Sequence, residues 1–257
     1  MLHKSLLALA VFAILLSGCS DEAVALPTTA PFATAPALPP LHVVVFVDQT
    51  TSMDGARVAP VMAAQFAPVY ERLAISGGEL AVGLVRDDSD RPFTRLFVPP
   101  PPNAPPVRPQ PKNVFEAAAA RKRDDAERAR YAQVQRAWRS DITARQAVFA
   151  RTVEPILAHP ADAPSTDIWS ALRRADVFLS EPNAFARPTR NVVILVSDGV
   201  ETASRTAAPR LSAAAQIVLV NGAGEVGTLA SLAPIRFESF DAAIRYAVAD
   251  GGTHVRR

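Results

Sequence analysis

Residues 43–52 read VVVFVDQTTS, a hydrophobic run that ends in Asp48 and continues into the hydroxyl side chains of Thr50, Thr51 and Ser52. A second run, VVILVSDG at residues 192–199, brings Asp198 close behind its apolar residues. Runs of this kind are typical of strands that are buried on both faces of a parallel sheet. The loops that leave the carboxyl ends of such strands gather in one crevice, where these folds bind ligands. We therefore expect the two aspartates to lie close together, in a site for a hard cation.

Strand-like and helical segments alternate through most of the chain. Strands are expected at residues 42–47, 79–86, 93–98, 191–196, 213–220 and 235–240, and helices at residues 53–75, 167–179, 228–232 and 241–249. This alternation predicts an α/β fold of three layers, a doubly wound and mostly parallel sheet with helices on both faces. The turn-rich residues 87–90 favour a hairpin between the second and third strands. Pro60 and Pro68 indicate that the first helix is kinked or begins later than its apolar spacing suggests.

Residues 99–160 are expected to form an insertion in this fold. Eight of the thirteen residues 99–111 are proline, and Asn113 and Glu116 then resemble a capping box at the start of a long helical stretch. Pro155 and Pro160 are expected to end it. The sequence leaves open a single projecting helix and a helical hairpin. One apolar stripe favours packing on the domain over a dedicated partner-binding arm; it comprises Tyr131, Val134, Trp138, Ile142, Phe149 and Val153.

The N-terminus has the pattern of a secretory signal. His3 and Lys4 precede eleven apolar residues at 6–16, too few to cross a bilayer as a helix, and Ser17-Gly18-Cys19 follows. This ending resembles the bacterial lipobox, which predicts a signal peptide over residues 1–19 and lipidation of Cys19. Because Cys19 is the only cysteine, intrachain disulfides, thiol catalysis and cysteine-based zinc sites are excluded.

A spacer rich in proline, alanine and threonine is expected at residues 20–41, with the folded domain at residues 42–250. The mature protein is thus expected to be exported and held at a membrane by its lipid anchor. Ser20 stands where aspartate would signal retention in the inner membrane of enteric bacteria, so the periplasmic face of the outer membrane is favoured. The net charge of +2 gives weak support for nucleic-acid binding, and no nucleic-acid partner is expected.

Three separated motifs together resemble the metal-ion-dependent adhesion site of the von Willebrand factor type A (VWA) family. Asp48, Thr50 and Ser52 match the first motif, Thr166 the second and Asp198 the third. Two positions depart from the family pattern. Thr50 stands where serine is usual, which keeps the hydroxyl group. Ser165 stands where glycine often precedes the threonine, which leaves Thr166 the least secure of the five.

The resemblance implies that these five residues bind Mg²⁺, or Mn²⁺ or Ca²⁺, through oxygen atoms. It also implies that an acidic residue of a partner protein completes the coordination, so that the site serves protein–protein interaction and not catalysis. The two carboxylates of Asp48 and Asp198 do no more than balance the charge of a divalent ion. The ion can therefore still attract a carboxylate from a partner protein. Asp54 and Asp167 are close to these residues in the sequence. They are expected to lie in the first turns of helices, where the helix dipole favours an acidic side chain, and not to bind the ion.

Three alternatives are open. A phosphohydrolase would use Asp48 as nucleophile, but it needs a second acid at position 50 and a core lysine, and no lysine follows Lys122. Residues 222–227 read GAGEVG, the spacing of a dinucleotide-binding loop, but Pro234 leaves too short a helix after them. A structural envelope protein with an incidental ion, or none, is the third alternative. His42 is expected at a strand edge and outside any site.

Overall fold

The computed structural model describes residues 38–55, 58–106, 108, 113–182, 185, 187–203, 208–212, 214–221 and 227–249. The predicted signal peptide, Cys19 and most of the predicted spacer lie outside the described residues. So do residues 222–226 of the glycine-rich stretch.

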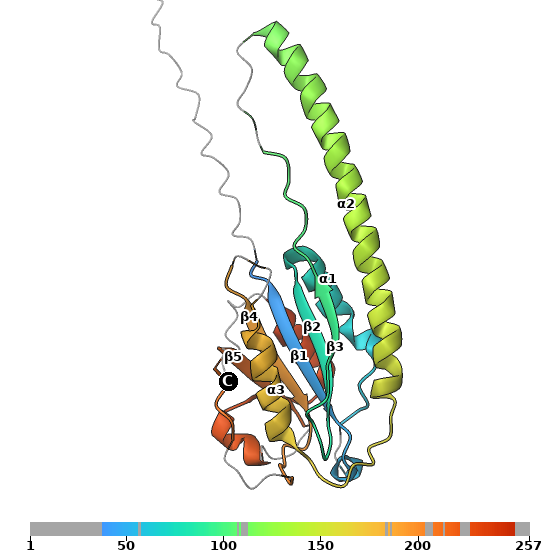
Figure 1. Ribbon diagram of the computed structural model, residues 1–257, viewed down its shortest axis with the longest axis vertical. Helices are drawn as coiled ribbons and strands as arrows, with labels where there is room; N and C mark the ends of the chain where they lie inside the picture. Colours follow the sequence, from blue (N-terminus) through green and yellow to red (C-terminus); the bar gives the residue numbers. More distant parts are fainter. Residues whose placement is uncertain are drawn as a thin grey trace, which may run out of the picture. The chain divides into compact units, whose positions relative to one another are not determined.

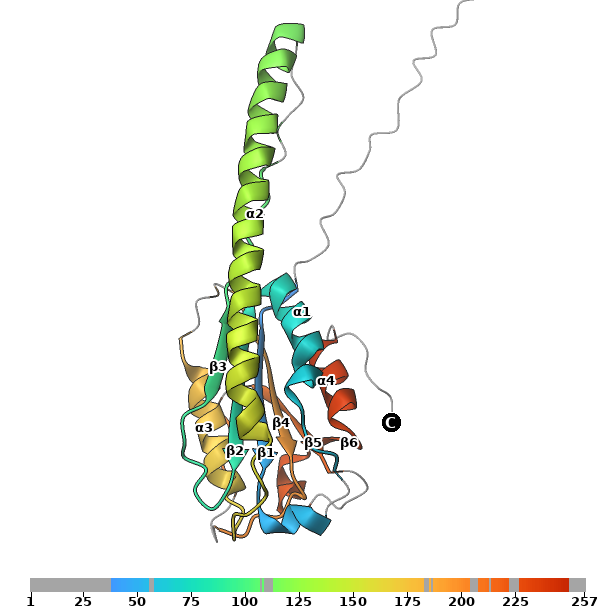
Figure 2. The same ribbon diagram turned by 90° about the vertical axis from the view of Figure 1, so that its right-hand side faces the viewer.

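One mixed sheet organises the described part of the chain. Its six described strands lie in the order β3-β2-β1-β4-β5-β6, and Figures 1 and 2 together show them with their helices. Among the described strands, the β2–β3 pair is antiparallel and the other pairs are parallel. This is the order of a doubly wound sheet, which changes direction between β1 and β4. The predicted fold class and the predicted hairpin are therefore confirmed. The strands are β1 (Leu41–Asp48), β2 (Gly78–Val85), β3 (Thr94–Val98), β4 (Arg190–Val196), β5 (Ala215–Val220) and β6 (Ile235–Phe237).

Helices cover both faces of the sheet (Figures 1 and 2). One face packs against α1 (Ala67–Ser76), α4 (Phe240–Val248) and the C-terminal part of α2 (Val114–Leu157). The other face packs against α3 (Ile168–Ser180) and the 3₁₀ helix η3 (Gly227–Leu232). Two further 3₁₀ helices are η1 (Thr51–Gly55) and η2 (Ala63–Phe66).

The central strand β1 shows why the run at residues 43–47 is continuously apolar. Its side chains alternate between the two faces, so that Val43 and Val45 join the core under α1 and α4, while Val44 and Phe46 join the core under α3. Every residue of β1 is buried. Because helices cover both faces, both sets of alternating positions are mostly apolar.

Three expected boundaries differ in the structure. The first helix begins at Ala67 and not at residue 53, since Pro68 is at the N-terminus of α1, where its missing N–H costs nothing. Strand β6 ends at Phe237, because Ser239 caps α4 by accepting a hydrogen bond from the Ala242 N–H at 3.3 Å. Pro155 lies inside α2, so the expectation that it ends the helix was wrong. The helix continues to Leu157, which is buried together with Val153.

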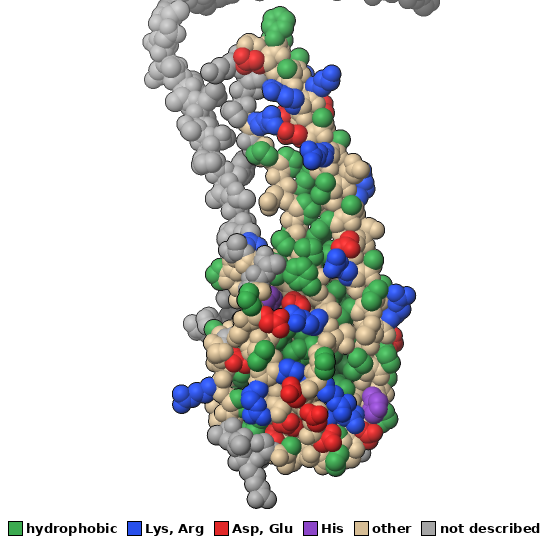
Figure 3. Space-filling view, viewed as in Figure 1, with side chains coloured by type: hydrophobic (Ala, Val, Ile, Leu, Met, Phe, Trp, Pro, Cys, Tyr) green, Lys and Arg blue, Asp and Glu red, His purple; other side chains and the backbone are tan. Residues whose placement is uncertain are grey.

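The insertion contains one continuous helix and not a helical hairpin. Helix α2 has 44 residues, a length of about 66 Å at the usual rise per residue. Of the predicted stripe, Ile142, Phe149 and Val153 are buried against the domain, whereas Val134 is 46% exposed. The stripe therefore packs only along the C-terminal part of α2. The N-terminal part extends past the sheet, with acidic and basic side chains intermixed on its surface (Figure 3).

Asn113 caps the extended end of α2. Its Oδ1 accepts from the Glu116 N–H at 2.8 Å, and its amide donates to Glu116 Oε1 at 2.9 Å. We expect Asn113→Ala to destabilise the first turn by about 1 kcal/mol and to speed amide hydrogen exchange there, while the melting temperature stays unchanged. Gln133→Ala, an exposed substitution within α2, is the control and should not speed exchange. Unchanged exchange at residues 114–118 in Asn113→Ala would contradict the cap's role.

Candidate functional site

The candidate site lies at the carboxyl edge of the sheet, where β1 and β4 lead into separate loops. Asp48 is the last residue of β1, and Ser197 and Asp198 follow β4, the next strand in the sheet. This is the point at which the strand order changes direction, and loops diverge there to leave a crevice. Asp48 is 4% exposed, so its carboxylate lies almost entirely inside the protein.

Both oxygens of Asp48 accept hydrogen bonds. Oδ1 accepts from the Thr50 backbone N–H at 3.0 Å and from the Thr50 hydroxyl at 2.7 Å. Oδ2 accepts from the Ser197 hydroxyl at 2.6 Å. A short polar side chain that bonds to the backbone two residues later stabilises a tight turn. The loop after β1 is thereby fixed against the loop after β4.

Hydroxyl groups extend this network to two more of the predicted residues. The Thr166 hydroxyl donates to Thr50 Oγ1 at 3.1 Å, and Thr50 Oγ1 lies 3.0 Å from Ser52 Oγ. The structure thus joins Asp48, Thr50, Ser52 and Thr166 through direct hydrogen bonds. Ser52 is exposed while Thr50 and Thr166 are buried, so the cluster opens to solvent on the side of Ser52.

Thr166 is firmly held although Ser165 departs from the family pattern. Its N–H donates to the Thr202 hydroxyl at 2.7 Å. Its carbonyl oxygen accepts from the N–H groups of Thr202 and Ala203 at 3.0 and 3.1 Å. These bonds connect the Thr166 loop to the loop after β4. The serine at position 165 therefore leaves the hydroxyl of Thr166 inside the cluster.

Asp198 lies beside the network but forms no direct hydrogen bond with the other four predicted residues. It is half-buried, and its Oδ1 accepts from the Val200 N–H at 2.9 Å. Its negative charge contributes to raising the pKa of Asp48. The structure therefore brings four of the predicted residues into contact and places the fifth within electrostatic range.

Burial is the main cause that raises the pKa of Asp48 above its ordinary value, and the charge of Asp198 adds to it. Hydrogen bonds from Ser197 and Thr50 oppose the change. Among the described residues, neither Asp48 nor Asp198 forms an ion pair with a lysine or an arginine. The site is thus a pair of acidic groups that no basic side chain in the described part of the chain balances.

Sequence reasoning did not assign three residues that shape this site. Ser197 donates to Asp48 and accepts from the Gly199 N–H at 3.0 Å. Gln49 is buried, and its amide donates to the Ile156 carbonyl at the end of α2 at 2.7 Å. Glu201 is buried and accepts from the Trp169 N–H at 3.0 Å, at the start of α3. Ser197 could have been found, because it directly follows the apolar run of β4.

The two nearby aspartates that were expected to favour helix starts have different outcomes. Asp167 caps α3, and its Oδ1 accepts from the Ser170 N–H at 3.1 Å. The expected role of Asp167 at the start of a helix is therefore confirmed, although the residue lies at the N-cap position and not in the first turn. Asp54 lies in η1, and the contacts of its side chain are outside the described part of the structure.

No family model matches this chain, and no curated protein matches it in sequence. Solved structures resemble it at low identity. The ArnB paralog VWA2 from Sulfolobus acidocaldarius has 11% identity and a TM-score of 0.37, covering 82% of this chain and 45% of that one. The pilus adhesin SpaC from Lactobacillus rhamnosus GG, in its open conformation, has 15% identity and a TM-score of 0.32, covering 64% of this chain and 15% of that one.

Another structure of the SpaC adhesin has 12% identity and a TM-score of 0.38, covering 82% of this chain and 30% of that one. The chain therefore spans less than half the length of each of these proteins. The likeness concerns the fold alone. The strand order and register of the sheet define the fold.

Proposed function

We propose that this chain is an exported, lipid-anchored VWA-like domain that binds a divalent cation through Asp48, Thr50, Ser52, Thr166 and Asp198. The bound ion, Mg²⁺ or else Mn²⁺ or Ca²⁺, attracts an acidic side chain of a partner protein. The site therefore serves as a docking point, and we assign no catalytic residue.

The observation that carries this proposal is a pair of neighbouring acidic residues that have no basic partner among the described residues. Asp48 is almost fully buried, Asp198 is half-buried, and no described lysine or arginine pairs with either. A buried charge is costly unless an opposite charge or a metal ion compensates it. A divalent cation supplies that compensation, and the surrounding groups are the oxygen ligands that hard cations prefer.

The donor set also suits docking. Asp48 and Asp198 together carry the charge needed to balance one divalent ion, because the hydroxyls of Thr50, Ser52 and Thr166 are neutral. The exposed Ser52 and the half-buried Asp198 leave the site open toward solvent. An ion that is only just neutralised, and open on one side, can accept a carboxylate from outside.

The phosphohydrolase alternative lacks its chemical parts. Position 50 is threonine, and its hydroxyl already donates to Asp48. The chain contains only Lys4, Lys112 and Lys122, and Lys122 is on the exposed part of α2. These residues support a binding role for Asp48 over a nucleophilic one.

The proposal places the domain outside the cytoplasm through its N-terminus. Cys19 in its lipobox supplies the anchor, and residues 20–41 supply the spacer. Ser20 after the cysteine favours the periplasmic face of the outer membrane. Within the described residues, no helix combines the length and the apolar character needed to cross a membrane.

Thermal unfolding of the full chain with and without metal tests the site. At a Mg²⁺ concentration about one hundred times its dissociation constant, binding should add about 2.7 kcal/mol, which corresponds to a rise of about 5 to 10 °C in melting temperature for a domain of this size. Mn²⁺ and Ca²⁺ are compared in parallel, with chelator as the reference. If none of the three ions raises the melting temperature, the metal site is wrong.

Affinity capture tests the docking role separately. The full chain is exposed to envelope extracts in Mg²⁺ and then washed with a chelator. A partner that the chelator releases, and that wild type binds but Asp198→Asn does not, is the expected result. Stabilisation by Mg²⁺ without any chelator-sensitive partner would favour a structural envelope protein with an incidental ion.

A further inference from the structure

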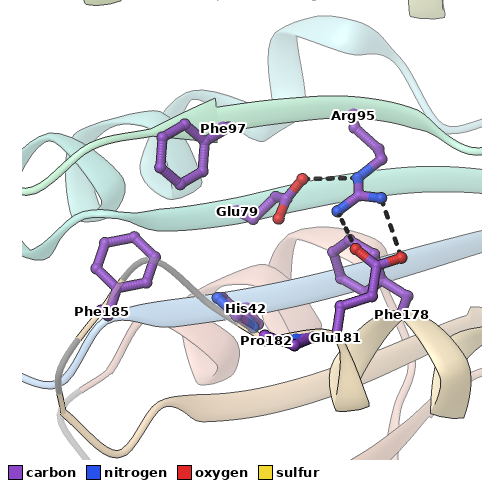
Figure 4. Close-up of a pocket in the computed structure, with 8 residues that line it drawn as sticks. All are labelled: His42, Glu79, Arg95, Phe97, Phe178, Glu181, Pro182 and Phe185. Atoms are coloured by element: carbon purple, nitrogen blue, oxygen red, sulfur yellow. Dashed lines mark hydrogen bonds and ion pairs between the residues drawn. The ribbon is translucent and has the colours of Figure 1, made fainter.

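A pocket of about 310 Å³ lies at the other edge of the sheet, away from the candidate metal site. His42 and Glu79 contribute to it from the starts of β1 and β2, and Glu181 from just beyond the end of α3 (Figure 4). Phe97 lines it from the antiparallel strand β3, close to that strand's end. Its residues therefore come from elements that meet at the amino edge of the parallel strands.

One arginine and two glutamates give the pocket an excess negative charge. Arg95 donates from Nε to Glu79 Oε1 at 2.7 Å, and from its two terminal nitrogens to Glu181 at 2.7 and 3.2 Å. The guanidinium carbon lies 4.6 Å from the centre of the Phe178 ring. Both oxygens of Glu181 are thus occupied, whereas Glu79 Oε2 accepts no hydrogen bond from a described residue. Glu79 therefore has spare capacity as an acceptor.

His42 is the unexplained polar group of the pocket. It was expected at a strand edge, and it is the second residue of β1, but it is only 4% exposed. Its ring lies 6.1 and 6.0 Å from the rings of Phe178 and Phe185. Within the described structure neither ring nitrogen has a hydrogen-bond partner. A buried polar group without a partner costs about 1 to 3 kcal/mol, so its presence calls for an explanation.

We propose that this pocket binds a primary ammonium or guanidinium group. Such a group donates N–H bonds to Glu79 Oε2 and to the unprotonated nitrogen of His42. The rings of Phe97 and Phe185, whose centres are 5.8 Å apart, also line the pocket, and an aromatic ring attracts a cation that lies over its face. Burial lowers the pKa of His42 below 6.5, which keeps the imidazole neutral at neutral pH and able to accept.

Other ligand classes fit less well. An anion would meet the excess carboxylate of Glu79 and Glu181. A wholly apolar molecule would leave both nitrogens of His42 without partners. The volume is at the lower end of the range for small-molecule sites, so it suits a short amine or one basic side chain. A free amine and a lysine or arginine side chain of a peptide present the same chemistry.

Nuclear magnetic resonance of the full chain in mild detergent tests this binding, with chelator present so that the metal site plays no part. Butylamine is the probe for a free ammonium group, and short peptides ending in lysine or arginine are the probes for a side chain. We expect the ¹⁵N resonances of the His42 ring to shift with a dissociation constant of about 1 mM. Tighter binding of a peptide than of butylamine would identify the side chain as the source.

Butyrate and tetramethylammonium are the ligand controls, because one has the wrong charge and the other has no N–H to donate. Glu79→Gln should weaken butylamine binding at least about tenfold, whereas Glu71→Gln, an exposed change on α1, should not. His42→Phe should lose the binding while keeping or raising the melting temperature, since it removes the unpartnered nitrogens. An absent His42 shift, an equal response to butyrate, or full binding by Glu79→Gln would each overturn the proposal.

Discussion

Replacing Asp48 with asparagine is expected to raise the free energy of unfolding of the metal-free protein by about 1 to 3 kcal/mol at neutral pH and to abolish its stabilisation by Mg²⁺. Asparagine keeps the shape of the side chain. Its carbonyl oxygen can still accept from Thr50, and its amide can donate to Ser197. The substitution removes a buried negative charge beside Asp198. Without metal, this charge destabilises the folded protein, whereas it is required for binding the metal ion.

The pH dependence of this effect has a definite sign. Burial raises the pKa of Asp48 above its ordinary value of 3.8, so the folded protein holds this proton more tightly than the unfolded chain. The resulting contribution to stability is complete below pH 3.8 and is lost as the pH rises through the raised pKa. The advantage of Asp48→Asn over wild type, without metal, should therefore grow as the pH is raised from 4 to 7.

Urea unfolding at several pH values, with chelator and with Mg²⁺, measures both parts of this prediction. Asp87→Asn is the matched control, because Asp87 is an exposed carboxylate just beyond the carboxyl end of β2. It should change neither the metal-free stability nor the response to Mg²⁺. A variant Asp48→Asn that responds to Mg²⁺ like wild type would remove Asp48 from the metal site.

The strand-and-acid runs predicted the fold, for a physical reason. A strand buried on both faces is apolar along most of its length, so β1 and β4 are visible as VVVFV and VVILV. Parallel neighbours bring their carboxyl ends together, which is why Asp48 and Asp198 could be placed near one another. Thr50, Ser52 and Thr166 were predicted only from the resemblance to the VWA motif. In the structure, Thr50 donates to Asp48, while Ser52 and Thr166 form hydrogen bonds with Thr50.

Features that depend on packing between distant segments could not be predicted in the same way. His42 is polar within an apolar strand, and only the arrangement of Phe178 and Phe185 shows that it is buried beside a pocket. Pro155 was expected to end its helix, yet burial of Leu157 extends α2 beyond it. The contact between Gln49 and Ile156 joins residues 107 positions apart, a distance that local patterns do not report.

Phe149→Ala in α2 is expected to lower the free energy of unfolding of the whole domain by about 3 to 5 kcal/mol. Phe149 is 3% exposed. Its ring makes edge-on contacts with Phe66 and Tyr70, with ring centres 6.3 and 6.2 Å apart. Alanine would leave a cavity between α2 and the helices beneath it. Urea unfolding followed by circular dichroism measures the loss.

Val148→Ala is the matched control for this prediction. Val148 is the preceding residue of α2 and is 55% exposed, so its truncation should change the unfolding free energy by no more than about 0.5 kcal/mol. If Phe149→Ala instead leaves the main unfolding transition where it is and releases only α2, the inserted helix is not part of the domain's cooperative core.

The same substitution should also reach the candidate metal site. The Gln49 side chain, one residue after Asp48, is 2% exposed and donates to the Ile156 carbonyl in the last turn of α2. The Gln49 carbonyl accepts from the Ala163 N–H at 3.0 Å, just beyond the same helix. Loosening α2 therefore loosens the loop that carries Thr50 and Ser52.

We expect Phe149→Ala to weaken Mg²⁺ binding severalfold under conditions where the variant is still folded. Val148→Ala should leave Mg²⁺ binding unchanged. Equal Mg²⁺ affinities in the two variants would show that the loop is held independently of the inserted helix.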